Sequence, residues 1–219
     1  PIVVTRSAGS RIWDIDGNEY VDLVNGFGTN LFGHSPSFVT QAIGDQLKRG
    51  IEIGPQSPLA GPVATLLCDI VGHERAAFCN TGSEAVMAAV RMARTVTARD
   101  TIVMFGGAYH GIFDEVLARG TSIDGQLRAV PIAPGIPGSA CENVIVLEYG
   151  SQSALDILAA RGAEIAAVLV EPVQSRRPDL QPAQFLRDLR QITAKTGTAL
   201  IFDEVVTGFR VHPGGVQAL

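Results

Sequence analysis

Residues 199–210 read ALIFDEVVTGFR, and this stretch says more about the fold than any other. The four apolar residues at its start predict a strand that is buried on both faces, as in a parallel sheet covered by helices. The strand ends at two carboxylates, Asp203 and Glu204. Ligands bind at the carboxyl ends of strands in open parallel sheets, so these acids are candidate ligand-binding groups. Neighbours on a strand point to opposite faces, so the two acids are not expected to serve one ligand directly.

An acid in this position has three interpretations. A nucleotide hydrolase would use it to hold Mg²⁺, but that class also needs a glycine-rich phosphate loop with a lysine. The two lysines, Lys48 and Lys195, do not follow a glycine, which excludes such a loop. The acid could instead pair with a cationic ring nitrogen of a cofactor, or it could be an exposed, solvated strand end. The last two alternatives stay open at this point.

Composition narrows the class of protein. Of the 219 residues 46% are hydrophobic, which suits a well-buried α/β core. The net charge of −5, without a basic cluster, argues against nucleic acid as a partner. The longest apolar runs are too short to cross a bilayer, so we expect no membrane association. Three widely spaced cysteines fit a reducing, cytoplasmic location and no disulfide framework. Because the sequence starts at a proline, we expect it to be part of a longer chain.

The second and larger part of the chain alternates strands and helices. Apolar runs predict strands at 76–79, 101–105, 143–147, 165–170 and 199–202. Amphipathic patterns predict helices at 83–97, 153–161 and 182–195. This alternation predicts an α/β fold with right-handed crossovers and a mainly parallel sheet flanked by helices.

The N-terminal part has a different pattern. Residues 11–23 predict a hairpin around a two-residue Asp16-Gly17 turn. Helices are expected at 37–49, with a Ser37 cap, and at 60–71. We therefore divide the chain into an N-terminal segment, 1–58, and part of a large domain, 59–219.

Residues 80–84, NTGSE, lie between a predicted strand and a predicted helix. Gly82 allows a ligand to approach the backbone closely, and the first helical turn has free N–H groups. With the Ser83 hydroxyl, this arrangement can hold a phosphate. The alternative is an ordinary helix cap formed by Thr81 or Ser83.

Two further motifs follow predicted strands. In residues 105–111, FGGAYHG, the glycines leave the ring of Tyr109 accessible to a flat ligand. His110 has no metal-binding spacing with another histidine, so we predict no metal site. In residues 171–174, EPVQ, the proline favours an extended conformation at Glu171. The alternative for the first motif is a tyrosine that anchors a loop and a histidine that bonds the backbone. The alternative for Glu171 is a polar strand end. A phosphorylated aromatic cation would match the phosphate-binding segment at 80–84, the ring of Tyr109, and the carboxylates of Asp203 and Glu171 together.

These motifs resemble class III pyridoxal-phosphate aminotransferases. The resemblance rests on residues 80–85, 109–111, 171–174 and 203–210, which occur in the family's order and cover essentially the whole chain. It is strongest to the glutamate-1-semialdehyde aminomutase-like branch, and residues 54–59 and 174–178 resemble aminotransferase domains of polyketide and non-ribosomal peptide synthetases. The resemblance implies a fold type I homodimer that binds pyridoxal 5′-phosphate. It also implies transfer of an amino group to an aldehyde or keto acceptor, which is either a small molecule or tethered to a carrier.

The resemblance also implies roles for single residues. The backbone of Gly82 and Ser83 would hold the cofactor phosphate. Tyr109 would stack on the pyridine ring, and His110 is placed with the cofactor-binding residues. In the same way Asp203, the catalytic residue, would pair with the ring nitrogen and Val205 would pack on the opposite ring face. Glu171 would lie near the substrate.

The sequence departs from the family pattern in two places. Many ω-aminotransferases have glutamine where this chain has Val206, which favours the aminomutase-like branch. The family's catalytic lysine lies beyond Arg210 and is not reached before Leu219, whereas Lys48 and Lys195 are expected to be surface residues of helices. An aminomutase or racemase, which needs no external acceptor, and a non-catalytic cofactor-binding fragment therefore remain as alternatives.

Overall fold

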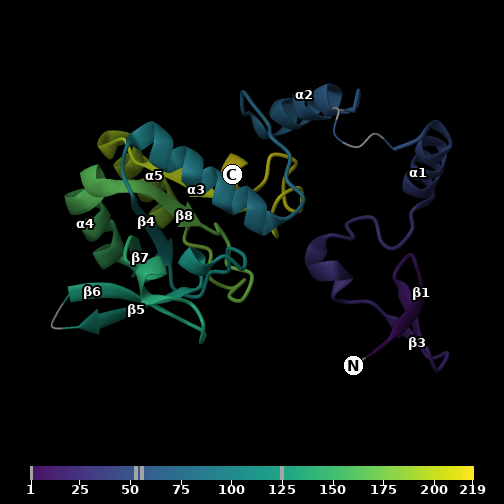
Figure 1. The fold of residues 1–219 in the computed structure, drawn as a ribbon, viewed down its shortest axis with the longest axis horizontal. Coiled ribbons are helices and arrows are strands. Elements are labelled where there is room, and N and C mark those ends of the chain that lie inside the picture. Colours follow the sequence, from purple (N-terminus) through teal and green to yellow (C-terminus); the bar gives the residue numbers. More distant parts are fainter. Residues whose placement is uncertain (1, 52–53, 55–56, 124–125) are drawn as a thin grey trace. The chain divides into compact units, whose positions relative to one another are not determined.

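The computed structural model describes residues 2–51, 54, 57–123 and 126–219. The chain separates into two compact units, Pro1–Val63 and Ala64–Leu219, which are coloured purple to blue and blue to yellow in Figure 1. The domain boundary placed after residue 58 stays a prediction.

The first unit contains a small antiparallel sheet in the order β1-β2-β3, formed by β1 (Val4–Ala8), β2 (Arg11–Asp14) and β3 (Glu19–Val21). The predicted hairpin is present, but its turn is longer than the expected two residues. The N–H of Asp14 donates to the carbonyl of Asn18 at 3.1 Å, and Gly17 has a φ of +84°. This is a three-residue loop with a left-handed glycine.

The carboxylate of Asp14 explains the longer turn. It accepts hydrogen bonds from the backbone N–H groups of Asp16 (3.0 Å) and Asn18 (2.8 Å) and from the hydroxyl of Tyr20 (2.8 Å). The side-chain amide of Asn18 donates to the same carboxylate at 3.0 Å, and this hydrogen bond is the main cause that holds the pKa of Asp14 below its usual value. An aspartate that closes the loop with its own side chain thus replaces the two-residue turn.

Two helices follow at the predicted positions. The first, α1 (Ser37–Arg49), belongs to the first unit, whereas α2 (Ala60–Val71) begins in the first unit and continues into the second. The N-cap of α1 is Pro36 and not the expected Ser37, and no side chain caps the helix. The apolar side chains at helical spacing in α1, Val39, Ile43 and Leu47, are exposed, and no residue of this helix is buried. No helix in the described ranges is both long and apolar enough to span a membrane.

The second unit is built on a parallel sheet in the order β7-β4-β8-β9. Its strands are β4 (Thr101–Phe105), β7 (Val144–Leu147), β8 (Ile165–Val170) and β9 (Ala199–Phe202). The helices are α3 (Gly82–Thr97), α4 (Gln152–Arg161) and α5 (Ala183–Thr196). Figure 1 shows them around the sheet, so the predicted flanked parallel sheet is confirmed.

The alternation of side chains along each strand gives the sheet two hydrophobic cores. On one face Val103 and Phe105 of β4 pack with Leu158 of α4 and Leu189 of α5. On the other face the intervening residues pack against the apolar stripe of α3 (Ile102, Met104, Val86, Val90, Ala93). Burial on both faces explains why every residue of β8 is buried and apolar.

One predicted strand is absent, and two strands are present that were not predicted. Residues 76–79 form no strand, and Phe78 is 54% exposed. The apolar pattern is present, but a strand also needs a neighbour, and no described strand pairs with this segment. The antiparallel pair of β5 (Ala118–Ile123) and β6 (Gln126–Pro131) was not predicted from the sequence, and the connection between the two strands lies outside the described residues.

Arg99 joins several elements at the sheet edge where β4 begins. Its guanidinium donates to the carbonyls of Gly162 (3.1 Å), Ile165 (3.0 Å), Thr196 (3.1 Å) and Gly197 (3.3 Å). Two of these carbonyls belong to the end of α5, where a positive charge also complements the helix dipole. The cation therefore holds the start of β8 and the end of α5 together.

We predict that Arg99→Ala lowers the free energy of unfolding by about 2–3 kcal/mol, because it removes charge-assisted hydrogen bonds and leaves carbonyls unsatisfied. Arg99→Lys should lower the free energy of unfolding by less than Arg99→Ala, because an ammonium keeps the charge but lacks the planar set of N–H donors of a guanidinium. Urea unfolding followed by circular dichroism measures both. Arg91→Ala, on the exposed side of α3, is the matched control and should change stability by less than about 0.5 kcal/mol. Equal effects of the Arg91 and Arg99 changes would contradict this role.

Candidate functional site

The four sequence motifs meet at one edge of the parallel sheet. Asp203 directly follows β9, and Glu171 directly follows β8. The turn with Tyr109 and His110 follows β4, and α3 begins at Gly82. The carboxyl ends of parallel strands lie at the same edge, so the strand order explains how segments distant in sequence come together.

The centre of the site is a buried pair formed by His110 and Asp203. The Nδ1 atom of His110 lies 2.7 Å from Oδ2 of Asp203, and the two side chains are 1% and 4% exposed. A carboxylate only accepts, so Nδ1 carries the proton and donates it. The other oxygen of Asp203 accepts from the N–H of Val205 at 3.2 Å. The alternative of an exposed, solvated strand end is therefore excluded for Asp203, because the turn after β4 covers it.

The pair has unused hydrogen-bonding capacity. The Nε2 atom of His110 is buried and has no partner among the described residues. The carboxylate of Asp203 accepts two hydrogen bonds, whereas its oxygens offer about four positions. Buried polar groups are normally satisfied, so an unpaired one at a strand end calls for an explanation.

The start of α3 confirms the helix-cap alternative and leaves room for phosphate binding by the backbone of Gly82 and Ser83. Thr81 is the N-cap, and its hydroxyl accepts from the N–H of Glu84 at 3.2 Å. The carboxylate of Glu84 accepts from the N–H groups of Asn80 (2.8 Å) and Thr81 (3.0 Å). This capping box leaves the N–H groups of Gly82 and Ser83 without a hydrogen bond in the part of the chain that is described. Both N–H groups remain available to an anion.

Two other motifs touch the start of α3. The hydroxyl of Ser83 accepts from the N–H of Ile112 at 3.2 Å, and Gly111 packs so closely that a Cβ there would lie 2.9 Å from Cα of Ser83. A Cβ at Gly82 would lie 3.1 Å from a methyl group of Val205. Glycine at 82 and 111 thus allows the turn after β4 and the segment after β9 to close on the helix.

Glu171 binds the turn that carries Tyr109. Its carboxylate accepts from the N–H of Tyr109 at 2.9 Å and from the N–H of Ser175 at 3.2 Å, and the residue is 4% exposed. Its visible role is therefore to position the turn, while contact with a substrate stays a prediction. The ring of Tyr109 is free to receive a ligand, since the residue is 48% exposed.

The sequence analysis assigned no role to Gln174, which braces the same turn. Its Nε2 donates to the carbonyl of Gly106 at 3.0 Å, and the residue is 1% exposed. A Cβ on Gly107 would lie 3.0 Å from Oε1 of Gln174. A long amide three residues after Glu171, in a chain with two consecutive glycines after another strand, is the sequence signal that could have indicated this contact.

Glu204 faces away from the pair, as expected for a neighbour of Asp203. Its carboxylate accepts from the hydroxyl of Thr207 (2.8 Å) and from the N–H groups of Val216 (2.7 Å) and Gln217 (2.9 Å). It thereby folds the segment after β9 back onto the strand end. The sequence analysis did not assign this role, because the partners lie up to 13 residues away.

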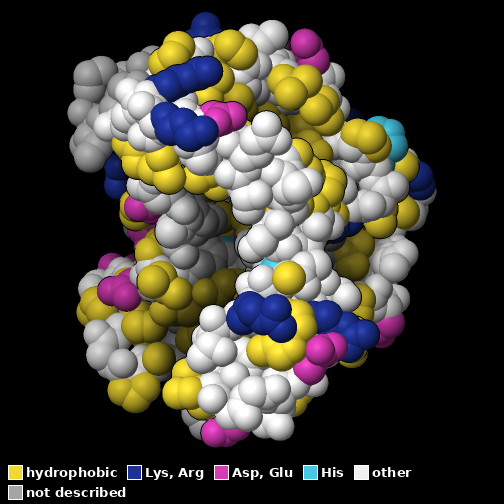
Figure 2. Space-filling model, turned by 90° about the vertical axis from the view of Figure 1, so that its right-hand side faces the viewer, with side chains coloured by type: hydrophobic (Ala, Val, Ile, Leu, Met, Phe, Trp, Pro, Cys, Tyr) yellow, Lys and Arg dark blue, Asp and Glu magenta, His cyan; other side chains and the backbone are white. Residues whose placement is uncertain are grey.

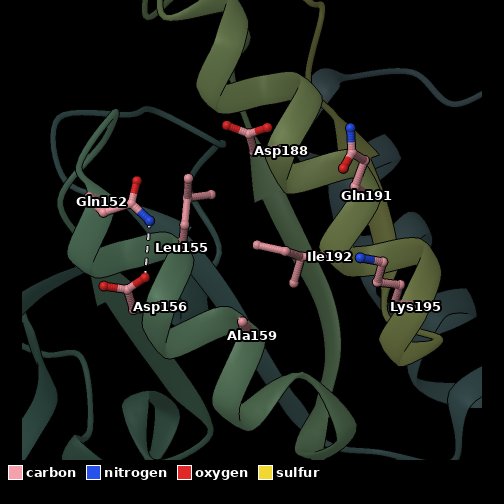
Figure 3. A pocket seen from close by; sticks show the side chains of 8 residues that line it. All are labelled: Gln152, Leu155, Asp156, Ala159, Asp188, Gln191, Ile192 and Lys195. Carbon is pink, nitrogen blue, oxygen red and sulfur yellow. Dashed lines mark hydrogen bonds between the residues drawn. The ribbon is translucent and has the colours of Figure 1, made fainter.

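The lysines lie elsewhere. A groove of about 260 Å³ lies between α4 and α5. Figure 3 shows Lys195 and Asp188 on the α5 side of this groove and Asp156 on the α4 side. None of the predicted site residues lines this groove. Lys48 pairs with Asp45 at 3.0 Å on the surface of α1. Both lysines are therefore surface residues of helices, as predicted.

Comparison with known sequences places the motifs in a family context. A family model described as aminotransferase class-III matches residues 1–215. Glutamate-1-semialdehyde 2,1-aminomutase of Chloroflexus aggregans is 43% identical over 222 residues, which cover 100% of this chain and 50% of that protein. The same enzyme of Aquifex aeolicus is 39% identical over 223 residues, which cover 100% of this chain and 52% of the relative. The chain thus spans about half the length of the relatives it matches.

Solved structures of transaminases share the fold of this chain. An omega-transaminase from Sphaerobacter thermophilus superposes with a TM-score of 0.91 at 32% identity, covering 100% of this chain and 51% of that structure. A structure described as a transaminase with PLP bound gives 0.90 at 31% identity, with the same two coverages. The fold class and the family resemblance stated from the motifs are confirmed. The roles of the single site residues remain predictions.

We predict that Glu204→Gln in the full-length protein speeds amide hydrogen exchange at Val216 and Gln217 by about tenfold to a hundredfold. The reason is that charge-assisted hydrogen bonds contribute about 1.5–3 kcal/mol and each 1.4 kcal/mol is tenfold. Exchange followed by mass spectrometry measures the effect. Glu74→Gln, at an exposed position, is the control and should leave the exchange of both amides unchanged. Native exchange rates in the Glu204 variant would show that the carboxylate does not hold this segment.

Proposed function

Because the chain belongs to the class-III aminotransferase family, we propose that it is part of an enzyme that uses pyridoxal 5′-phosphate to transfer an amino group from a donor to an aldehyde or keto acceptor. The observation that carries this proposal is the buried His110–Asp203 pair, 2.7 Å apart, which joins two of the four motifs. The turn that carries His110 also contacts the other two motifs, through Glu171 and Ser83. A carboxylate held this way is suited to a protonated ring nitrogen.

The described residues fit the cofactor at each of its parts. The unpaired N–H groups of Gly82 and Ser83, at the positive end of α3, suit the phosphate. The accessible ring of Tyr109 suits one face of the pyridine ring, and Val205, which is 63% exposed, suits the other face. Asp203 retains acceptor capacity for the ring nitrogen.

When bound, the cofactor supplies an electron sink for the substrate carbon from which a proton is removed. Asp203 keeps a proton on the ring nitrogen, because an opposite charge in contact shifts a pKa by about 1–3 units. His110 donates to one oxygen of Asp203 and so fixes the direction in which the carboxylate points. Glu171 and Gln174 hold the turn that presents Tyr109. Together these residues form the cofactor-holding part of the site.

The catalytic lysine is placed in the remaining part of the full-length protein. Neither Lys48 nor Lys195 lies in the site. β9 pairs only with β8 among the described strands, so one of its edges is free. A hollow of about 920 Å³ lies beside it, lined in part by Leu200 and Phe202. An apolar space at an unpaired strand suits further strands of the same sheet, and we place the lysine on this added part.

A second candidate function is an aminomutase or racemase on the same scaffold. Two observations favour it: Val206 stands where many ω-aminotransferases have glutamine, and the relatives at 39–43% identity are named glutamate-1-semialdehyde 2,1-aminomutases. Such an enzyme returns the amino group to the same carbon skeleton. The third alternative, a non-catalytic cofactor-binding fragment, applies to the chain without its lysine.

We also propose a homodimer in the cytoplasm that acts on a small-molecule acceptor or on one tethered to a carrier protein. The first unit supports a partner surface, because it exposes large apolar side chains such as Leu23 (89%), Phe27 (86%) and Phe32 (68%). Figure 2 shows groups of hydrophobic side chains among polar ones on the visible face. The free cysteines Cys68, Cys79 and Cys141 suit a reducing compartment.

An isotope-labelled amino group tests the reaction. The full-length protein with pyridoxal 5′-phosphate should move the label from an amine donor to an added aldehyde or keto acid and leave the donor as a carbonyl compound. Label that moves within one carbon skeleton without any acceptor would support the aminomutase. A protein that binds the cofactor and moves no label in either assay would contradict both enzymatic functions.

We predict that Asp203→Asn lowers the rate of the half-reaction with an amine donor by about tenfold to a thousandfold, the span of a 1–3 unit pKa effect expressed in the transition state. The carboxylate is buried and paired, so some loss of stability is expected as well, and thermal unfolding is measured in parallel. Asp156→Asn on the exposed side of α4 is the matched control with unchanged rate. A native rate in a folded Asp203 variant would remove this residue from the reaction.

A further inference from the structure

We propose that Arg176 recognises a carboxylate group of the substrate beside the ring of Tyr109. This inference rests on the proposed function and names the substrate class of that site. It starts from one contact: the guanidinium carbon of Arg176 lies 5.9 Å from the centroid of the Tyr109 ring. The same ring is the accessible surface on which the site would receive its flat ligand.

The backbone of Arg176 is fixed relative to this ring. Glu171 accepts from the N–H of Tyr109, and Gln174 donates to the carbonyl of Gly106. Both of these side chains are buried, at 4% and 1% exposure. The carbonyl of Gln174 also accepts from the N–H of Arg177 at 2.9 Å, which closes a turn around position 176. Two buried braces and a closed turn thus keep the arginine next to the tyrosine.

The charge of Arg176 has no anionic partner among the described residues. The acid of the same loop, Glu171, is buried and its two oxygens accept backbone N–H groups. A cation at about 6 Å from an exposed ring gains only about 0.5–1 kcal/mol, so the contact with Tyr109 does not hold the guanidinium in place. The side chain is exposed and free to turn towards an anion.

The chemistry of the group selects the ligand. A guanidinium presents parallel N–H donors that match the two oxygens of a carboxylate, and it stays charged at any physiological pH. Amino donors and keto acceptors that are amino acids or keto acids carry such a group close to the reacting carbon. Arg176 is therefore placed to select acids over neutral amines and aldehydes, while the buried His110–Asp203 pair serves the cofactor.

The neighbouring Arg177 provides a matched control. It has the same side chain and is exposed, and no described contact joins it to the ring of Tyr109. The test compares Arg176→Gln, Arg176→Lys and Arg177→Gln in the full-length protein loaded with pyridoxal 5′-phosphate. Each variant is given alanine and alaninamide as amino donors, which differ only in the charged group. Binding of the non-reacting dicarboxylate succinate is titrated separately by calorimetry.

The expected result is a selective loss. Arg176→Gln should lower kcat/KM for alanine by about tenfold to a hundredfold and change it less than about threefold for alaninamide, because only the charge-assisted hydrogen bonds to the acid are lost. Succinate affinity should fall by a similar factor. Arg176→Lys should lose less of the kcat/KM for alanine and of the succinate affinity than Arg176→Gln, since lysine keeps the charge but lacks the parallel N–H donors of the guanidinium. Arg177→Gln should behave like the native protein in every assay.

Two outcomes overturn the inference. Equal losses for the acid and the amide would show that Arg176 only supports the turn or the ring. Native values in Arg176→Gln would show that the substrate carboxylate binds elsewhere. Succinate binding decides independently of turnover, so an Arg176-dependent affinity in a protein that moves no amino group would support this site and contradict the proposed function.

Discussion

The hydrogen bond between Nδ1 of His110 and Oδ2 of Asp203 is the contact on which the arrangement of the site depends. It joins residues 93 positions apart, from the ends of β4 and β9, two strands that are separated in the sheet by β8. Both groups are withdrawn from water, so breaking the pair would leave a buried charge without a partner. The turn after β4 is therefore held over the end of β9, and the carboxylate keeps one direction.

Other hydrogen bonds between segments distant in sequence surround this contact. Glu171 and Gln174, both after β8, bind the backbone of the turn after β4, and Ser83 at the start of α3 receives the far end of that turn. Each brace uses a buried or half-buried side chain to satisfy a backbone group of a neighbouring loop. Loops built this way have little freedom, which is what a site needs if it is to hold a flat ligand between two surfaces. At the opposite sheet edge Arg99 performs the corresponding task for the strand starts.

The local sequence pattern was sufficient to predict most helices and strands of the fold. β4, β8 and β9 and the helices α1 and α2 have the predicted bounds, because an apolar run between breakers and a 3.6-residue stripe are properties of the chain itself. Pattern failed where an element depends on a neighbour. Residues 76–79 have a strand pattern and no described partner, and the antiparallel pair β5–β6 has weak alternation and exists because its two strands pair with each other.

The motifs showed which residue types stand at the strand ends, and their order along the chain was enough to identify the family. Their partners depended on the tertiary structure. Asp203 and Glu204 are adjacent in sequence and equal in charge, yet one is buried against His110 and the other accepts backbone N–H groups of the segment at 216–217. Likewise, the sequence places Arg176 two residues after Gln174, and only the packing of two loops brings it to the ring of Tyr109. Hydrogen bonds between distant residues depend on which strands are neighbours, and that order is fixed by the packing of the whole sheet and not by any local pattern.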